Sequence, residues 1–126
     1  MLFLELDEVL EIHHDQIERY GGTLGIRDIR LLESALAMPR AGIAGQYFHT
    51  DLCETAAAYL FHLVMNHPFL DGNKRVGAMA AFTFLKLNGH TLNASAASFE
   101  KLVLSVASGK ADKLQVATFF RDNVEG

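Results

Sequence analysis

The sequence predicts an all-α fold, a compact single-domain bundle of about six helices. Apolar residues recur at spacings of three and four along almost all of the 126 residues, which is the period of one helix face. No alternating strand pattern extends beyond a few residues. Half of the residues are hydrophobic, so the chain can bury one core, and we expect residues 1–126 to form a single domain.

The first part of the chain predicts two helices with recognisable ends. The first helix stops at Gly21-Gly22. Its apolar stripe consists of Leu6, Val9, Leu10, His13, Ile17 and Tyr20. After a turn over residues 23–27, Asp28 can cap a second helix, which Pro39 ends. Residues 40–49 contain two glycines and no clear period, and we interpret them as a loop or a short helix.

Two strongly apolar helices are expected in the middle of the chain. Asp51 and Glu54 have the spacing of a capping box and open a helix that runs to about Asn66. A proline then interrupts the pattern, and a second helix runs from near Asn73 to the stop at Asn88-Gly89. Because both helices are apolar on most faces, we expect them at the centre of the bundle.

Two further helices complete the predicted fold, over about residues 97–107 and 112–123. Gly109 separates them, and Asp112 can cap the second. The only strand expected is a weak one at Thr91-Leu92-Asn93, which can pair with another edge.

Charge and composition exclude several classes of protein. The net charge is −4, whereas a general nucleic-acid binder normally presents a basic face, so no direct nucleic-acid partner is expected. The single cysteine, Cys53, excludes an internal disulfide. No stretch approaches the ~20 apolar residues of a membrane span, and the N-terminus is too acidic for a signal peptide. We therefore expect no membrane partner and a cytoplasmic location.

The residues that can carry chemistry gather between the two central helices, in His67-Pro68-Phe69-Leu70-Asp71-Gly72-Asn73-Lys74-Arg75. The first turn of a helix has unpaired backbone N–H groups and a dipole that favours an anion. Gly72 lets the backbone approach a ligand closely. Cations at this end cost a few tenths to about 1 kcal/mol each unless an anion offsets them. The donors Asn73, Lys74 and Arg75 therefore indicate a phosphate site.

Three other side chains of the loop have expected roles. Asp71 can supply the single carboxylate with which Mg²⁺ is often held beside phosphate oxygens. His67 can take a proton from an attacking hydroxyl. Phe69 is expected to anchor the loop in the core. A base, a metal ligand and a phosphate cradle are the parts of phosphoryl or nucleotidyl transfer, although the residues alone leave open a plain turn between two helices.

The order His-x-Phe-x-Asp-Gly-Asn-x-Arg over residues 67–75 resembles the signature of the Fic/Doc superfamily. Residues 20–28, followed by Leu32-Glu33-Ser34-Ala35, look like the N-terminal region of death-on-curing (Doc) toxins. The resemblance covers essentially the whole chain. It implies a Fic/Doc-like helical fold, with ATP as the substrate and Mg²⁺ as the metal ion. The implied roles are general base for His67, Mg²⁺ ligand for Asp71, and phosphate grip for Gly72, Asn73, Lys74 and Arg75.

Two positions distinguish the branches of that superfamily. Lys74 and Ala78 stand where Fic-type AMP transferases usually carry Gly and Arg, which favours the Doc branch, whereas Pro68 is typical of the Fic branch. The Doc resemblance implies a toxin that transfers the γ-phosphate of ATP to a threonine of translation elongation factor Tu and so blocks translation. AMP transfer by the same loop and a catalytically idle partner-binding domain are the alternatives.

The chain lacks the self-inhibitory pattern (Ser/Thr)-x-x-x-Glu-(Gly/Asn), because the only candidate, Glu125, has Arg121 four residues before it. An inhibitor is thus expected to be a separate protein. The resemblance implies an antitoxin of the prevent-host-death type, whose disordered tail folds as a helix in an apolar groove. Outside the loop, we expect His13 to be buried and hydrogen-bonded, His62 to be structural, and Arg27 to be solvated.

Overall fold

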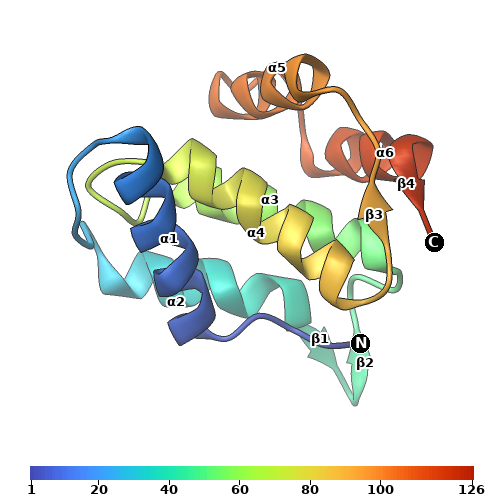
Figure 1. The fold of residues 1–126 in the computed structure, drawn as a ribbon. Helices are drawn as coiled ribbons and strands as arrows, with labels where there is room; N and C mark the ends of the chain where they lie inside the picture. Colours follow the sequence, from blue (N-terminus) through green and yellow to red (C-terminus); the bar gives the residue numbers. More distant parts are fainter.

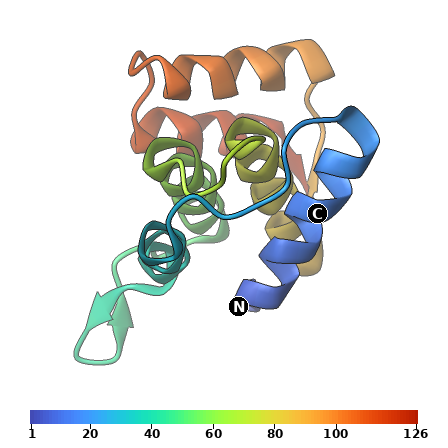
Figure 2. The ribbon, with the colours of Figure 1, turned by 90° about the vertical axis from the view of Figure 1, so that its left-hand side faces the viewer.

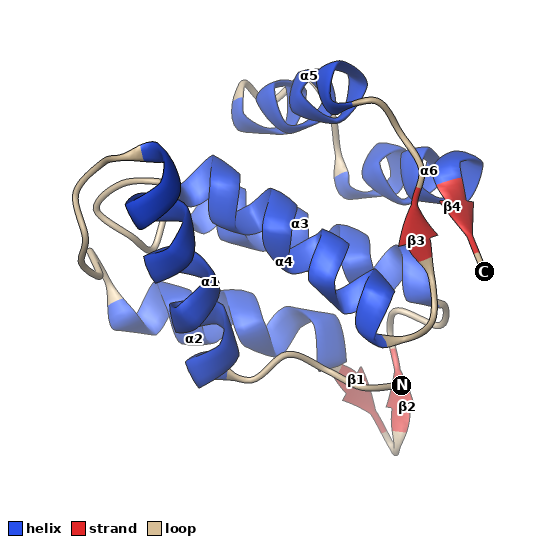
Figure 3. Cartoon of the chain, viewed as in Figure 1, coloured by secondary structure: helices blue, strands red, loops and turns tan.

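The computed structural model describes all 126 residues and confirms the all-α fold (Figures 1 and 3). It contains the six helices α1 (Leu6–Tyr20), α2 (Ile29–Ala37), α3 (Leu52–Asn66), α4 (Asn73–Leu87), α5 (Ala96–Ala107) and α6 (Lys113–Asn123). A 3-10 helix, η1 (Met38–Arg40), follows α2. The four short strands are β1 (Gly42–Ile43), β2 (Gln46–Tyr47), β3 (Thr91–Leu92) and β4 (Val124–Glu125).

The helices α3 and α4 form the centre of the bundle, as their apolar sequences predict. Figure 2 shows α5 and α6 on one side of this pair and α1 and α2 on the other. Gly77 allows α3 and α4 to pack closely, because a Cβ atom there would lie 2.8 Å from the Val64 side chain. A single apolar cluster draws residues from all six helices, and its largest fully buried side chains are Tyr59, Phe69, Phe84 and Phe120.

Three of the predicted helix caps are present. The Asp28 carboxylate accepts bonds from the first N–H groups of α2, and Asp112 forms a complete capping box with Gln115. Asp51 caps α3 by accepting a bond from the Glu54 N–H at 2.7 Å. The Glu54 side chain accepts a bond from the Thr50 hydroxyl instead, so the predicted capping box at this end is only half formed.

The prediction of a loop or short helix for residues 40–49 is wrong in part. After η1, the strands β1 and β2 form a hairpin with Gly42 opposite Tyr47. Ala44 and Gly45 make its two-residue turn with φ of 55° and 80°, the conformation that suits the twist of paired strands. The weak pairing predicted after α4 is confirmed, since β3 pairs with β4. None of the six helices combines the length and the apolar character that a membrane crossing requires.

Candidate active site

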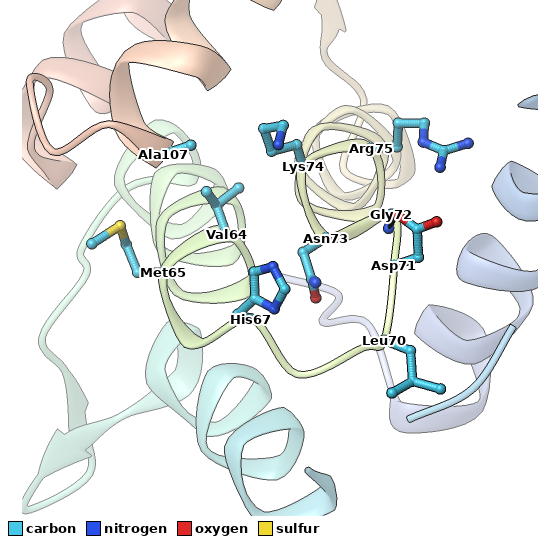
Figure 4. Close-up of a pocket in the computed structure, with 10 residues that line it drawn as sticks. All are labelled: Val64, Met65, His67, Leu70, Asp71, Gly72, Asn73, Lys74, Arg75 and Ala107. Atoms are coloured by element: carbon cyan, nitrogen blue, oxygen red, sulfur yellow. Dashed lines mark hydrogen bonds between the residues drawn. The ribbon is translucent and has the colours of Figure 1, made fainter. Parts of the chain in front are cut away.

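The loop between α3 and α4 borders a cavity of about 500 Å³ at one end of the bundle (Figure 4). The cavity brings together all of the predicted site residues except the anchor Phe69. Its lining consists of Val64, Met65, His67, Leu70, Asp71, Gly72, Asn73, Lys74, Arg75 and Ala107. In Figure 4 the His67 ring lies beside Asn73, and Lys74 and Arg75 point to different sides of the first turn of α4.

The first turn of α4 is open for an anion. Unlike α2, α3 and α6, this helix has no side-chain cap, because its N-cap residue is Gly72 with φ of 78°. The backbone N–H groups of Asn73, Lys74 and Arg75 have no acceptor within the chain. No acidic residue occupies this turn. Three unpaired donors and the positive end of the helix dipole therefore face the cavity, an arrangement suited to phosphate.

The two cationic residues of this turn, Lys74 and Arg75, differ in their contacts with the rest of the chain. Arg75 donates through Nη1 to the backbone oxygens of Gln16 at 3.2 Å and Gly21 at 2.9 Å, which ties it to the end of α1. Its Nε and Nη2 atoms have no protein acceptor, so they remain free to bond a phosphate. Lys74 is exposed, and neither cation forms an ion pair with a carboxylate. Both positive charges thus stay available to a ligand.

Asp71 is held as a charged carboxylate at the edge of the cavity. Its two oxygens accept backbone bonds from Thr23 at 3.1 Å and Gly72 at 2.8 Å. These bonds lower the pKa of Asp71 below its ordinary value, so the group is ionised near neutral pH. No three His, Cys, Asp or Glu side chains converge anywhere in the chain. Asp71 is the one carboxylate in the lining of the cavity, and a single carboxylate together with phosphate oxygens and waters is a common way of holding Mg²⁺.

His67 ends α3 in an unusual backbone conformation. Its φ of 51° and ψ of 53° are left-handed, which for a residue with a side chain costs on the order of 1–3 kcal/mol and persists only where the surroundings fix it. The side chain is exposed to the cavity. Such a strained residue in a cavity is typical of a functional position.

Phe69 and Asn73 close the loop from the inside. The Asn73 amide donates to the Phe69 carbonyl at 3.0 Å and accepts from the Phe69 N–H at 2.9 Å. Phe69 is fully buried, and its ring stacks on His13 with 3.8 Å between centroids. The Asn73 side chain was expected to grip phosphate. In the structure Asn73 is 4% exposed, and its side-chain amide forms hydrogen bonds with the Phe69 backbone. The backbone N–H of Asn73, which has no acceptor within the chain, can still face a ligand.

The segment between α1 and α2 packs against the loop and forms hydrogen bonds with its backbone. The sequence did not predict these contacts. Leu70 donates to the Gly25 carbonyl, and Ile26 and Phe69 form an isolated antiparallel bridge. Gly25 has a φ of 140°, which residues with a side chain rarely adopt, so the backbone conformation favours a glycine here. The glycines of residues 21–25 were the only signal in the sequence for this close approach.

Two side chains of this region support the loop directly. The His13 ring is buried and hydrogen-bonded, as expected: its Nε2 lies 2.8 Å from the Asp71 backbone oxygen. Arg27 was expected to be merely solvated. Although it is exposed, its guanidinium donates to the backbone oxygens of Asn66 and His67. A lone arginine in a turn gives no indication of such distant acceptors.

Comparison with known proteins assigns the family. The family model described as the Fic/DOC family matches residues 3–85. Toxin Doc of Mycolicibacterium smegmatis is 45% identical over 75 residues, which are 60% of this chain and 58% of that relative. Protein kinase doc of Escherichia phage P1 is 31% identical over 121 residues, 96% of this chain and 94% of that relative. The chain therefore belongs to the Fic/DOC family, and its similarity is to Doc-type members of that family.

Proposed function

We propose that the chain is the toxin of a toxin–antitoxin pair and acts as a protein kinase. It would transfer the γ-phosphate of ATP to a threonine of translation elongation factor Tu and so block translation. The observation that carries the proposal is the uncapped first turn of α4, where three free N–H groups and two unpaired cations face the same cavity as His67. The names of the two relatives support the toxin and kinase classes.

In the proposed reaction, His67 takes the proton from the threonine hydroxyl. The hydroxyl oxygen forms a bond to the γ-phosphorus, the bond from that phosphorus to the β–γ bridging oxygen breaks, and ADP leaves. The free N–H groups of α4, with Lys74 and Arg75, hold the phosphates and neutralise charge on them. Mg²⁺ held by Asp71 would neutralise further phosphate charge.

AMP transfer is the second candidate, because Pro68 is typical of the Fic branch and a phosphate cradle alone does not choose between phosphates. Lys74 in place of glycine favours the kinase, since it occupies space beside the cradle and adds a charge. A catalytically idle partner-binding domain is the third reading. The free N–H groups of α4 that face the same cavity as His67 disfavour it, because a domain that only binds a partner has no need of a phosphate cradle beside a base.

Labelled ATP separates the three readings. The chain is incubated with purified elongation factor Tu and ATP that carries radioactive phosphate at either the α or the γ position. Label on the factor from the γ position alone supports the kinase. Label from the α position overturns it in favour of AMP transfer, and label from neither position supports the idle domain. His67→Ala should remove transfer without unfolding the chain, because the His67 side chain is exposed and contributes nothing to the core.

We infer that the inhibitor is an antitoxin of the prevent-host-death type, bound beside this site. A mostly apolar groove of about 600 Å³ runs between α1, α4 and α5. Tyr20 and Leu104 line it and are 69% and 49% exposed, which suits the apolar face of a partner helix. Lys74 and Arg75 border both this groove and the phosphate cavity. An acidic side chain on the bound tail would therefore compete with phosphate for the same cations.

A further inference from the structure

We propose that Arg27 is a positioning residue, whose guanidinium fixes the backbone of His67 so that the imidazole faces the cavity. This inference rests on the proposed function, in which His67 is the general base. Arg27 lies 40 residues before His67 in the sequence and touches none of the groups that would hold nucleotide. It acts only through the backbone that carries the base.

The contacts of Arg27 are unusually concentrated. Its Nε donates to the His67 carbonyl at 2.7 Å and its Nη2 donates to the Asn66 carbonyl at 3.0 Å. Its own backbone N–H donates to the Pro68 carbonyl at 2.7 Å. One residue therefore binds three consecutive carbonyl groups. The guanidinium forms no ion pair with any carboxylate of the chain, so its hydrogen bonds within the chain all go to backbone carbonyl groups.

The Asn66 and His67 carbonyls lie at the C-terminal end of α3, where a positive charge is favourable. The last carbonyl groups of a helix have no helical partner and carry the negative end of the helix dipole. The end of α3 has no glycine cap, because His67 itself adopts the left-handed conformation. A planar guanidinium with two parallel N–H donors matches two adjacent carbonyls, and a charged donor forms the stronger kind of hydrogen bond.

These bonds determine where the imidazole points. The Asn66 and His67 carbonyls belong to the peptide groups on either side of the His67 Cα atom, so their orientation sets both φ and ψ of His67. The φ of 51° is strained for a residue with a side chain. The other supports of the loop act from Pro68 onward: the Asn73 amide donates to the Phe69 carbonyl, and the backbone N–H of Asp28 donates to the Pro68 carbonyl at 3.0 Å. Without the guanidinium, the His67 carbonyl loses its bond, while the Asn66 side chain still donates to the Leu31 carbonyl at 3.0 Å and the loop from Pro68 onward keeps its own bonds.

The proposal predicts a loss of rate without a loss of nucleotide binding. In Arg27→Ala, we expect kcat to fall about 10- to 100-fold, the scale of a displacement near 1 Å of a reacting group. The KM for ATP should stay unchanged, because the phosphate cradle lies on α4. Arg27→Lys should restore only part of the rate, since one ammonium cannot reproduce the paired donors.

Arg30→Ala is the matched control. Arg30 carries the same charge, is exposed in the first turn of α2, and makes no side-chain hydrogen bond, so its removal should leave kcat at the wild-type value. Unfolding by denaturant verifies that each variant is folded. A wild-type kcat in Arg27→Ala, or an equal loss in Arg30→Ala, would overturn the positioning role.

A second measurement does not depend on activity. The three-bond coupling between the amide proton and Hα of His67 in isotope-labelled protein reports φ directly. This coupling should change in Arg27→Ala and stay at its wild-type value in Arg30→Ala; an unchanged value in Arg27→Ala overturns the proposal. If the wild-type chain transfers no label at all, the proposed function fails, and the coupling still decides whether Arg27 holds His67.

Discussion

His13 and Asp71 are separated by 58 residues, yet Nε2 of His13 lies 2.8 Å from the backbone oxygen of Asp71. The same ring stacks on Phe69 at an interplanar angle of 8°. His13 therefore connects α1 to both Phe69 and Asp71 of the loop. Since the Asp71 carbonyl can only accept, the hydrogen must reside on Nε2.

Replacement of His13 tests this connection. His13→Ala removes a buried ring and one hydrogen bond, so we expect the free energy of unfolding to fall by about 2–4 kcal/mol. Transfer activity should fall as well, because the loop loses its support. Denaturant unfolding and initial rates measure the two effects. His14→Ala, at the exposed neighbouring position, should change neither, and equal effects of both substitutions would contradict the connection.

Asn73→Ala distinguishes loop closure from a phosphate grip by the side chain. The substitution leaves the buried N–H of Phe69 without its acceptor, so we expect the unfolding free energy to fall by about 1–3 kcal/mol even without nucleotide. A side chain that only gripped phosphate would leave the stability of the free chain unchanged. Thermal unfolding with and without ATP separates the two outcomes.

The sequence predicted the positions of the helices better than the roles of individual side chains. The ends of α4 and the caps Asp28 and Asp112 follow from local rules, because the residues that stop or cap a helix lie within a few positions of it. The hairpin was missed because Ala44, at φ of 55°, is not a residue that favours that turn.

The hydrogen bonds of the Arg27 and Asn73 side chains were not predicted, for a different reason. The motif shows that an asparagine follows Gly72, but not whether its side chain or its backbone N–H faces the ligand. Arg27 bonds carbonyl groups some 40 residues away, and no periodicity or spacing rule relates the two segments. Such contacts arise from tertiary packing, which local patterns do not contain.

Mg²⁺ dependence tests the role of Asp71. Asp71→Asn keeps an oxygen that can accept a backbone N–H but removes the charge, so we expect at least a tenfold rise in the Mg²⁺ concentration required for half-maximal transfer. Because the N–H bonds lower the pKa of Asp71, the wild-type requirement should not rise from protonation of this group near neutral pH. Asp122→Asn, exposed on α6, is the control and should show the wild-type requirement.

The pair His62 and Lys113 predicts how stability depends on pH. Burial, reinforced by the charge of Lys113, lowers the pKa of His62 from 6.5 to about 4. The neutral imidazole suits the Lys113 ammonium, whose Nζ lies 3.0 Å from Nε2. Because the unfolded chain binds a proton more readily, the contribution of this site is present above pH 6.5 and is lost as the pH falls toward 4.

His62→Gln should therefore flatten the fall in unfolding free energy across that pH range, since glutamine offers an acceptor that does not titrate. Denaturant unfolding at a series of pH values measures the slope. His14→Gln, at an exposed histidine, should retain the wild-type slope. An unchanged slope in His62→Gln would show that another group controls the acid sensitivity.

The groove between α1, α4 and α5 yields a prediction that separates inhibition from catalysis. Leu104 lines the groove and is 49% exposed, so Leu104→Asp places a charge on the apolar surface without opening the core. We expect the affinity for a prevent-host-death-type antitoxin to fall at least tenfold, because an unpaired charge would be buried by the partner, while transfer in its absence stays unchanged. Leu114→Asp is the matched control, because Leu114 is 70% exposed on α6 and does not line the groove. Calorimetric titration measures the affinity, and wild-type affinity in Leu104→Asp would place the antitoxin elsewhere on the chain.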